Sequence, residues 1–210
     1  MPETCYACAA VATTVEHCPP QSFFPEGHRK NLITVPSCSN HNNANSKDVE
    51  YTRNWITTSW GVNSAGQDLF EQKTKKSFDR SPRLLTQTFG TMRTVKFERE
   101  ITGAAKCDVP RCRVVFEACV RALHYHNTRE KHEKWGIVMQ GLAFDPTVPG
   151  LNMQPLMNLV GTLQALNFPQ IPTANPEVFQ YGAAQLDGRQ VYCFVFYGSY
   201  VVYALPLTGV

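Results

Sequence analysis

The sequence predicts an α+β fold built from two parts of different composition. Residues 1–60 are rich in Cys, His, Asn and Pro, and they contain two chelating pairs with β-prone runs between them. Residues 112–125 repeat apolar positions at helical spacing, and residues 178–207 alternate β-prone runs with turn residues. We therefore expect an N-terminal module over 1–60 and a basic α+β region over 67–210 that ends in an antiparallel β-meander.

Composition excludes several classes of protein. With 43% hydrophobic and 18% charged residues, the chain can bury a core and is neither a disordered tail nor a coiled coil. Eight cysteines in 210 residues lie below the density of disulfide scaffolds, and residues 1–5 lack the basic start of a signal peptide. We expect a cytoplasmic protein whose thiolates bind metal.

The elements of the N-terminal part follow from local signals. Residues 31–35 (Asn-Leu-Ile-Thr-Val) form a β-prone run that should end at Pro36. A helix should begin at the Ser46 cap, because the acids Asp48 and Glu50 follow in its first turn. Residues 61–66 are expected to form the loop that separates the two parts.

The later elements are predicted in the same way. Residues 94–101 alternate charged and apolar side chains, which predicts one half-buried strand. Residues 112–125 should form a helix, and residues 186–189 (Leu-Asp-Gly-Arg) should turn a hairpin. The uncharged run 191–210 has the length of a membrane span. However, Gly198, Pro206 and its Tyr, Val and Phe content favour strands of the meander.

Two chelating pairs predict a structural zinc site. The pairs are Cys5-Tyr6-Ala7-Cys8 and Cys38-Ser39-Asn40-His41, separated by 29 residues. A gap of two residues lets both side chains of a pair reach one tetrahedral ion, and four protein ligands leave no open position for catalysis. The alternative is a set of buried free cysteines with a surface histidine. A second site made of Cys107, Cys112, Cys119 and His124 has looser spacing, so we expect small buried hydrophobes there.

An acid, an imidazole and two amides surround these pairs. Glu16 directly precedes His17, and the pair can serve one centre only if the strand bends, which Pro19 and Pro20 favour. Asn31 opens the second β-run, and Asn42 follows the last candidate zinc ligand. The alternative is that Glu16 and His17 are ordinary turn residues of a zinc ribbon.

These residues resemble the HNH (ββα-metal) endonuclease family in its zinc-stapled, bacterial stand-alone form. The resemblance covers residues 5–55, including Asn42 through Tyr51, and the Pro-Gln-Ser-Phe after His17 is similar to the HNH domain of CRISPR effector nucleases. It implies an N-terminal ββα-metal module in which His17 is the general base and Asn31 fixes the loop that carries it. It also implies that Glu16 and Asn42 hold one catalytic Mg²⁺ or Mn²⁺, in an HNN variant with Glu in place of the commoner Asp.

The excess positive charge lies in one segment. Residues 73–134 hold 15 Lys and Arg against 7 Asp and Glu, a net charge of +8, whereas the whole chain carries +3. Cations beside an acidic site favour contact with a sugar-phosphate backbone, although a solvated charged face explains many such runs. We expect DNA contacts from Lys73, Lys75, Lys76, Arg80 and Arg83.

The sequence thus favours a metal-dependent endonuclease that hydrolyses DNA phosphodiester bonds with structural Zn²⁺ and catalytic Mg²⁺ or Mn²⁺. The alternative is a non-catalytic zinc-ribbon module that binds nucleic acid or protein. In a third hypothesis, the chain is also a DNA endonuclease but acts as a subunit of an antiviral defence system. It then cleaves only DNA that an ATPase or sensor partner presents. No membrane partner is expected.

Overall fold

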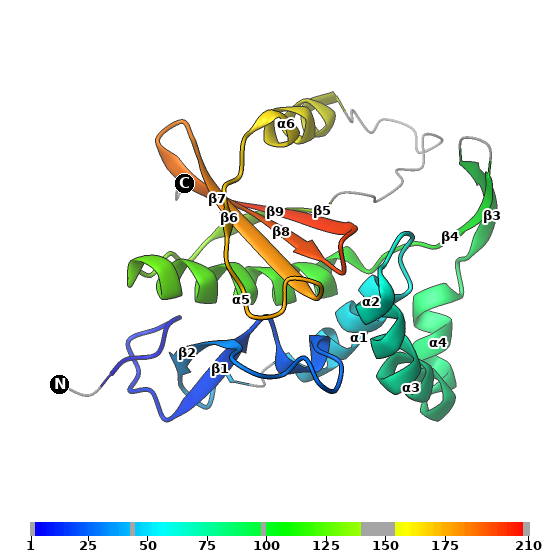
Figure 1. Ribbon diagram of the computed structural model, residues 1–210, viewed down its shortest axis with the longest axis horizontal. Helices are drawn as coiled ribbons and strands as arrows, with labels where there is room; N and C mark the ends of the chain where they lie inside the picture. Colours follow the sequence, from blue (N-terminus) through cyan, green and yellow to red (C-terminus); the bar gives the residue numbers. More distant parts are fainter. Residues whose placement is uncertain (1–2, 43–44, 98–99, 140–153, 208–210) are drawn as a thin grey trace.

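The computed structural model describes residues 3–42, 45–97, 100–139 and 154–207, and it confirms the α+β class. Figure 1 shows the long helix α5 (Val109–Thr128) lying between a C-terminal sheet and a small N-terminal hairpin. Helices α1–α4 pack together at one end of the molecule. No helix of the described residues combines the length and apolar character that a membrane crossing requires.

The N-terminal module has the expected strand–strand–helix order. Strands β1 (Thr14–Cys18) and β2 (Ile33–Ser37) pair antiparallel, and the helix α1 (Ser46–Thr57) follows. A 3₁₀ turn, η1 (Gln21–Phe23), lies between the strands. Two expectations were wrong in detail. Strand β2 continues through Pro36, which a two-stranded sheet tolerates on an open edge, and the helix cap is Asn45 rather than Ser46.

A run of short helices occupies the next part of the chain. Asn63 caps α2 by accepting a hydrogen bond from the Gly66 amide, and Ser81 caps α4 by accepting one from Leu84. The expected loop over 61–66 is therefore shorter, because residues 64–66 already belong to α2. The elements are α2 (Ser64–Leu69), the π-helical turn η2 (Phe70–Thr74), α3 (Lys75–Arg80) and α4 (Pro82–Phe89).

The single strand expected over 94–101 is two strands. Strands β3 (Arg93–Phe97) and β4 (Glu100–Ala104) pair antiparallel in a sheet of their own. Alternation continues on both strands with the same period, and no Gly, Pro or Asn stands between 97 and 100 to signal a reversal. The pattern therefore could not locate where the chain turns back.

The C-terminal meander is confirmed and is part of a larger sheet. Strands β7 (Phe179–Leu186), β8 (Arg189–Phe196) and β9 (Tyr200–Pro206) pair in sequence, while β5 (Trp135–Met139) and β6 (Gln170–Ile171) add the two edges. The strand order is β5-β9-β8-β7-β6, and all neighbours are antiparallel. The uncharged run 191–210 lies within this sheet as far as residue 206, and residues 208–210 fall outside the described residues. Helix α6 (Gln154–Ala165) precedes β6.

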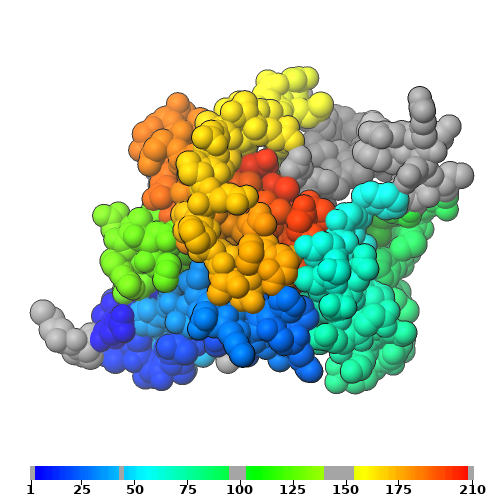
Figure 2. Space-filling model, in the orientation of Figure 1, coloured from blue at the N-terminus to red at the C-terminus, as the bar shows by residue number. Residues whose placement is uncertain are grey.

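One hydrophobic core connects the two predicted parts. Phe196 of the sheet contacts the rings of Phe23 in the N-terminal module and of Phe116 in α5, each with centroids 5.8 Å apart. Figure 2 shows the surfaces of the N-terminal module and of the helical segment side by side. This packing holds the basic segment next to the module that carries the candidate site.

Candidate metal centre and adjoining cleft

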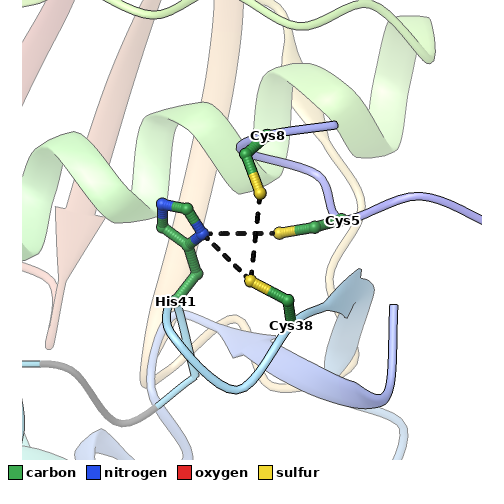
Figure 3. Close-up of side chains that lie close together, drawn as sticks. All are labelled: Cys5, Cys8, Cys38 and His41. Carbon is green, nitrogen blue, oxygen red and sulfur yellow. Dashed lines mark hydrogen bonds between the residues drawn. The ribbon is translucent and has the colours of Figure 1, made fainter. Parts of the chain in front are cut away.

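Two loops hold the predicted metal ligands. The Cys5 amide donates to the Ala10 carbonyl and the Tyr6 amide donates to the Pro36 carbonyl, both at 2.8 Å, so the first loop is fixed against β2. Cys38 follows β2 directly, and the His41 amide closes a turn onto the Cys38 carbonyl at 3.1 Å. Figure 3 shows the four side chains pointing toward one another.

Their geometry fits a tetrahedral zinc ion. The four ligand atoms all lie within 4.8 Å of one another. Cys8 Sγ and Cys38 Sγ are 3.9 Å apart, and His41 Nδ1 lies 3.6 Å from Cys5 Sγ and 3.3 Å from Cys38 Sγ. A tetrahedron with Zn–S bonds of about 2.3 Å has S···S edges of about 3.8 Å. These residues can therefore hold a metal ion such as zinc.

Electrostatics favour a thiolate in this group. Burial disfavours the charged form of Cys5, but hydrogen bonds from the Ala7 amide and from Cys38 outweigh it, so the pKa of the Cys5 thiol is lowered. Outside the cluster, the Lys131 ammonium donates to the Cys8 carbonyl at 2.7 Å and to Thr4 Oγ1 at 2.9 Å. The segment after α5 thus fixes the first loop.

A cleft of about 350 Å³ adjoins the metal centre and shares His41 and Tyr6 with it. Glu16 and His17 of β1 both line this cleft, and so does Asn42. The strand does not bend between Glu16 and His17 as expected, because β1 stays paired with β2 through Cys18. The cleft extends around the end of the strand, where Pro20, Gln21 and Ser22 also line it. The structure therefore brings three of the four candidate catalytic residues to one cavity.

Asn42 is oriented by the neighbouring strand. Its Nδ2 donates to the Val15 carbonyl at 3.3 Å, and its backbone amide donates to the Cys38 carbonyl at 2.9 Å. Because the side-chain nitrogen is engaged with β1, the carbonyl oxygen is the end of the amide that can act as a ligand. An oxygen ligand of this kind suits Mg²⁺ or Mn²⁺.

Helix α1 supplies a wall of the cleft, and Arg53 in this wall is not among the site residues that the sequence predicts. Ser46, Val49, Glu50 and Arg53 line the cleft, and their spacing of three, one and three residues puts them on one helix face. Arg53 is buried, and its Nη2 donates to Ser77 Oγ of α3 at 2.8 Å. Ser77 in turn donates to Glu50 at 2.8 Å. The spacing of these four residues along the helix was the feature of the sequence from which this wall could have been predicted.

Burial and charged neighbours lower the pKa values of two basic side chains at this wall. Burial lowers the pKa of the Arg53 guanidinium, and the carboxylate of Glu50 opposes that shift. The pKa of Lys73 is lowered first by burial and then by the positive charges of Arg29 and Arg53. Several cations thus gather where α1 meets the basic segment.

The fourth candidate catalytic residue, Asn31, and the helix acid Asp48 lie elsewhere. Asn31 lines a different, much smaller cavity together with Cys18 and Ile33, beside the end of β1. Its backbone is left-handed (φ 53°), a conformation that asparagine tolerates better than most residues. Asp48 pairs with Arg111 of α5 at 2.7 Å rather than lining the cleft.

The five basic candidates lie on η2, α3 and α4. Lys75 pairs with Glu71 at 3.4 Å, and Arg80 Nε donates to the Lys76 carbonyl at 3.1 Å. Lys76 and Arg83 are exposed, and Lys73 is half-buried near Arg53. The basic segment therefore begins at the wall of the cleft and continues outward along α3 and α4.

The looser cysteine set does not form a second centre. Cys107 and Cys112 contact each other, whereas the Cys18 thiol donates to the Cys119 carbonyl and His124 Nδ1 contacts the Tyr192 hydroxyl. Within the described part of the chain, only the Cys5, Cys8, Cys38 and His41 group brings three or more metal-binding side chains together.

No protein-family model, curated protein or solved structure matches this chain. The functional argument therefore rests on the residues and their arrangement.

Proposed function

We propose that this protein is a metal-dependent endonuclease of the HNH type that hydrolyses phosphodiester bonds of DNA. The observation that carries the proposal is the shared cleft. Glu16, His17 and Asn42 line one cavity, next to a Cys/His cluster that fits zinc, on a strand–strand–helix module. A purely structural zinc module has no need for these three side chains to line one cleft.

His17 is assigned the role of general base. Imidazole is the side chain best suited to take a proton near neutral pH, and hydrolysis requires an activated water. His17 is half-buried on β1 and lines the cleft in which the attacking water would have to bind. The zinc cluster is assigned a structural role, because it has four protein ligands.

Glu16 and Asn42 would hold the catalytic cation. A carboxylate and an amide oxygen form a hard ligand set, and two protein ligands leave positions open for phosphate oxygens. When bound, Mg²⁺ or Mn²⁺ neutralises charge on the phosphate and on the leaving oxygen. The orientation of Asn42, fixed through Val15, supports this assignment.

Arg53 is assigned to the phosphate. Its guanidinium lines the cleft, and hydrogen bonds to Asn54 Oδ1 at 2.8 Å and to Ser77 Oγ at 2.8 Å hold it in place. These bonds engage Nε and Nη2 of a pre-oriented guanidinium, so Nη1 is the nitrogen that would donate to a phosphate. Outside the cleft, the exposed cations of α3 and α4 support binding of the DNA backbone.

The decisive experiment compares wild type with His17→Ala in a plasmid-cleavage assay with Mg²⁺ or Mn²⁺. We expect wild type to cleave and the variant to lose about 10²- to 10⁴-fold in turnover, because a general base acts in the transition state. Zinc content, thermal stability and DNA affinity should remain near wild type. Cleavage by His17→Ala at the wild-type rate would refute the proposal, and a wild type that binds DNA without cutting it would favour the non-catalytic zinc module.

Asn42→Ala and Glu16→Gln separate the metal ligands from the base. Both variants should need more Mg²⁺ or Mn²⁺ to reach half-maximal rate, and Glu16→Gln should be rescued less because it removes the only charged ligand. Added metal should not restore His17→Ala. The measurement is rate against metal concentration for all three variants.

A further inference from the structure

Two cysteines outside the metal centre lie in contact. Cys107 Sγ and Cys112 Sγ are 3.7 Å apart, and both thiols are free. Cys107 lies in the connection between β4 and α5, and Cys112 lies in the first turns of α5. Neither residue belongs to the zinc cluster or lines the cleft described above.

Only one of the two thiols is accessible to solvent. Cys107 is partly exposed, whereas the Cys112 side chain is fully buried. A disulfide requires an S–S distance of about 2.05 Å, so the two sulfur atoms must approach by less than 2 Å from their present separation. Only residues 108–111 lie between the two cysteines, so no distant element has to move.

Contacts with helix α1 hold Cys107 and Cys112 in position beside each other. The Asp108 amide, next to Cys107, donates to the Tyr51 hydroxyl of α1 at 2.8 Å. Arg111, next to Cys112, bonds Asp48 at 2.7 Å, and its guanidinium lies over the Tyr51 ring at 4.5 Å from the centroid. Both ends of the connection are therefore fixed to α1, which keeps the two thiols together.

We propose that Cys107 and Cys112 are a redox-active dithiol that converts reversibly to an intramolecular disulfide. The oxidant is a low-molecular-weight disulfide such as oxidised glutathione. The exposed Cys107 thiolate attacks it, forms a mixed disulfide and releases one glutathione thiol. Cys112 then attacks the Cys107 sulfur, forms the Cys107–Cys112 bond and releases the second glutathione, which takes up the proton lost by Cys112. Two protein thiols are oxidised and one glutathione disulfide is reduced.

Exposure sets this order of attack, because Cys107 is partly exposed and Cys112 is buried, whereas the electrostatics of the pair slow the first attack. The hydrogen bond from Cys107 is the largest influence on Cys112 and lowers the pKa of its thiol, although burial opposes it. The same hydrogen bond and burial raise the pKa of Cys107. Cys112 is the resolving nucleophile because its sulfur lies next to the Cys107 sulfur, and the slow step should be the first attack by Cys107, whose thiol has the raised pKa.

The sequence offers a direct assay. Trypsin cuts after Lys106, Arg111 and Arg113, so digestion places the two cysteines on separate peptides, 107–111 and 112–113. Zinc-loaded full-length protein is incubated with oxidised glutathione, alkylated and digested without reduction. We expect the two peptides to appear as one disulfide-linked species, to separate on reduction, and to form without release of zinc.

Variants distinguish the roles of the two thiols. Cys112→Ser should stop at the mixed disulfide, so peptide 107–111 should carry glutathione. Cys112→Ala serves as a second variant, because a buried hydroxyl can disturb packing, and circular dichroism checks that both fold. Cys193→Ser is the matched control and should still form the linked species. Absence of linked peptides from folded wild type, or an equal yield of glutathione-bound Cys107 in wild type and Cys112→Ser, would overturn the proposal.

Discussion

At the scale of single residues, Arg53 is the residue whose assigned role depends most on the tertiary structure. It is buried, yet it lines the cleft and contacts α3 through Ser77. Burying a guanidinium is costly unless it is paired and hydrogen-bonded, and here Glu50 supplies a counter-charge at 3.8 Å while Asn54 Oδ1 accepts hydrogen bonds. An arginine held in this way is suited to receive an anion without reorganisation.

We predict that Arg53→Gln lowers kcat/KM for plasmid cleavage by about 10- to 100-fold, since a hydrogen bond to a charged group contributes about 1.5–3 kcal/mol. Arg53→Lys keeps the charge but loses the fork, so it should restore part of the activity. Thermal unfolding is measured alongside, and Ser77→Ala is the matched control, because it removes the same α1–α3 hydrogen bond without removing the charge. Loss of activity in Ser77→Ala equal to that in Arg53→Gln would assign Arg53 a structural role instead.

At the scale of elements, the N-terminal hairpin depends on what surrounds it. Strands β1 and β2 have five residues each and pair only with one another. A two-stranded ribbon of that size is marginal in water. Helix α5 packs along one side of the hairpin, and a metal ion held by the Cys/His cluster at its end would stabilise it further.

We predict about one tightly bound zinc per chain, because binding at a four-ligand thiolate site contributes about 10 kcal/mol or more to folding. Cys38→Ser should lose the zinc and expose residues 1–60 to proteolysis, while the Cys107→Ser control should keep it. Elemental analysis and limited digestion provide the measurements. Stoichiometric zinc in Cys38→Ser would contradict the assignment of this ligand.

The helices α3 and α4 are the elements that should contact the DNA backbone. Reversal of the exposed Lys76 and Arg83 to Glu should weaken binding and reduce the slope of log K against log salt by about one unit per lost phosphate contact. The control reverses Lys134 and Arg189, which gives the same change in net charge away from these helices. Equal salt slopes for the two double variants would locate the DNA surface elsewhere.

At the scale of the whole molecule, the N-terminal module and the C-terminal sheet share one core. Tyr197, in the turn between β8 and β9, is fully buried, and its hydroxyl donates to the Phe23 carbonyl of the module. Burial raises the pKa of this phenol, which keeps the hydroxyl protonated as a donor. The two predicted parts are therefore joined by a buried hydrogen bond as well as by aromatic contacts.

We predict that urea unfolds the protein in one transition when followed through Trp55, Trp60 and Trp135 fluorescence and through circular dichroism. Tyr197→Phe should lower stability by about 1–3 kcal/mol with an unchanged m-value, because it leaves a buried carbonyl without its donor. Tyr181→Phe, whose partner Asn127 is exposed, should cost less. Two separate transitions would show that residues 1–60 and 67–210 unfold independently.

Local features were predictable from the sequence. The Cys/His cluster follows from two-residue gaps, the meander follows from alternation with Asp187-Gly188 and Gly198, and α5 follows from apolar spacing, although it is longer than expected. The β3–β4 reversal was missed because the period of two is the same on both strands. Strand β5 was missed because its pairing partner β9 is distant in sequence, and β6 was missed because it has only two residues.

The sequence by itself determined the ligand set, the acid–imidazole pair and the strand–strand–helix order, because each depends on neighbours within a few residues. Only the tertiary structure decided that Arg53 meets Ser77, that the basic helices begin at the cleft, and that Asn31 lies at a different cavity. These relations depend on which buried faces pack together. That choice is made by the whole core, in which Phe116 of α5 contacts Phe196 of the sheet on one side of the helix while β1 and β2 pack on the other.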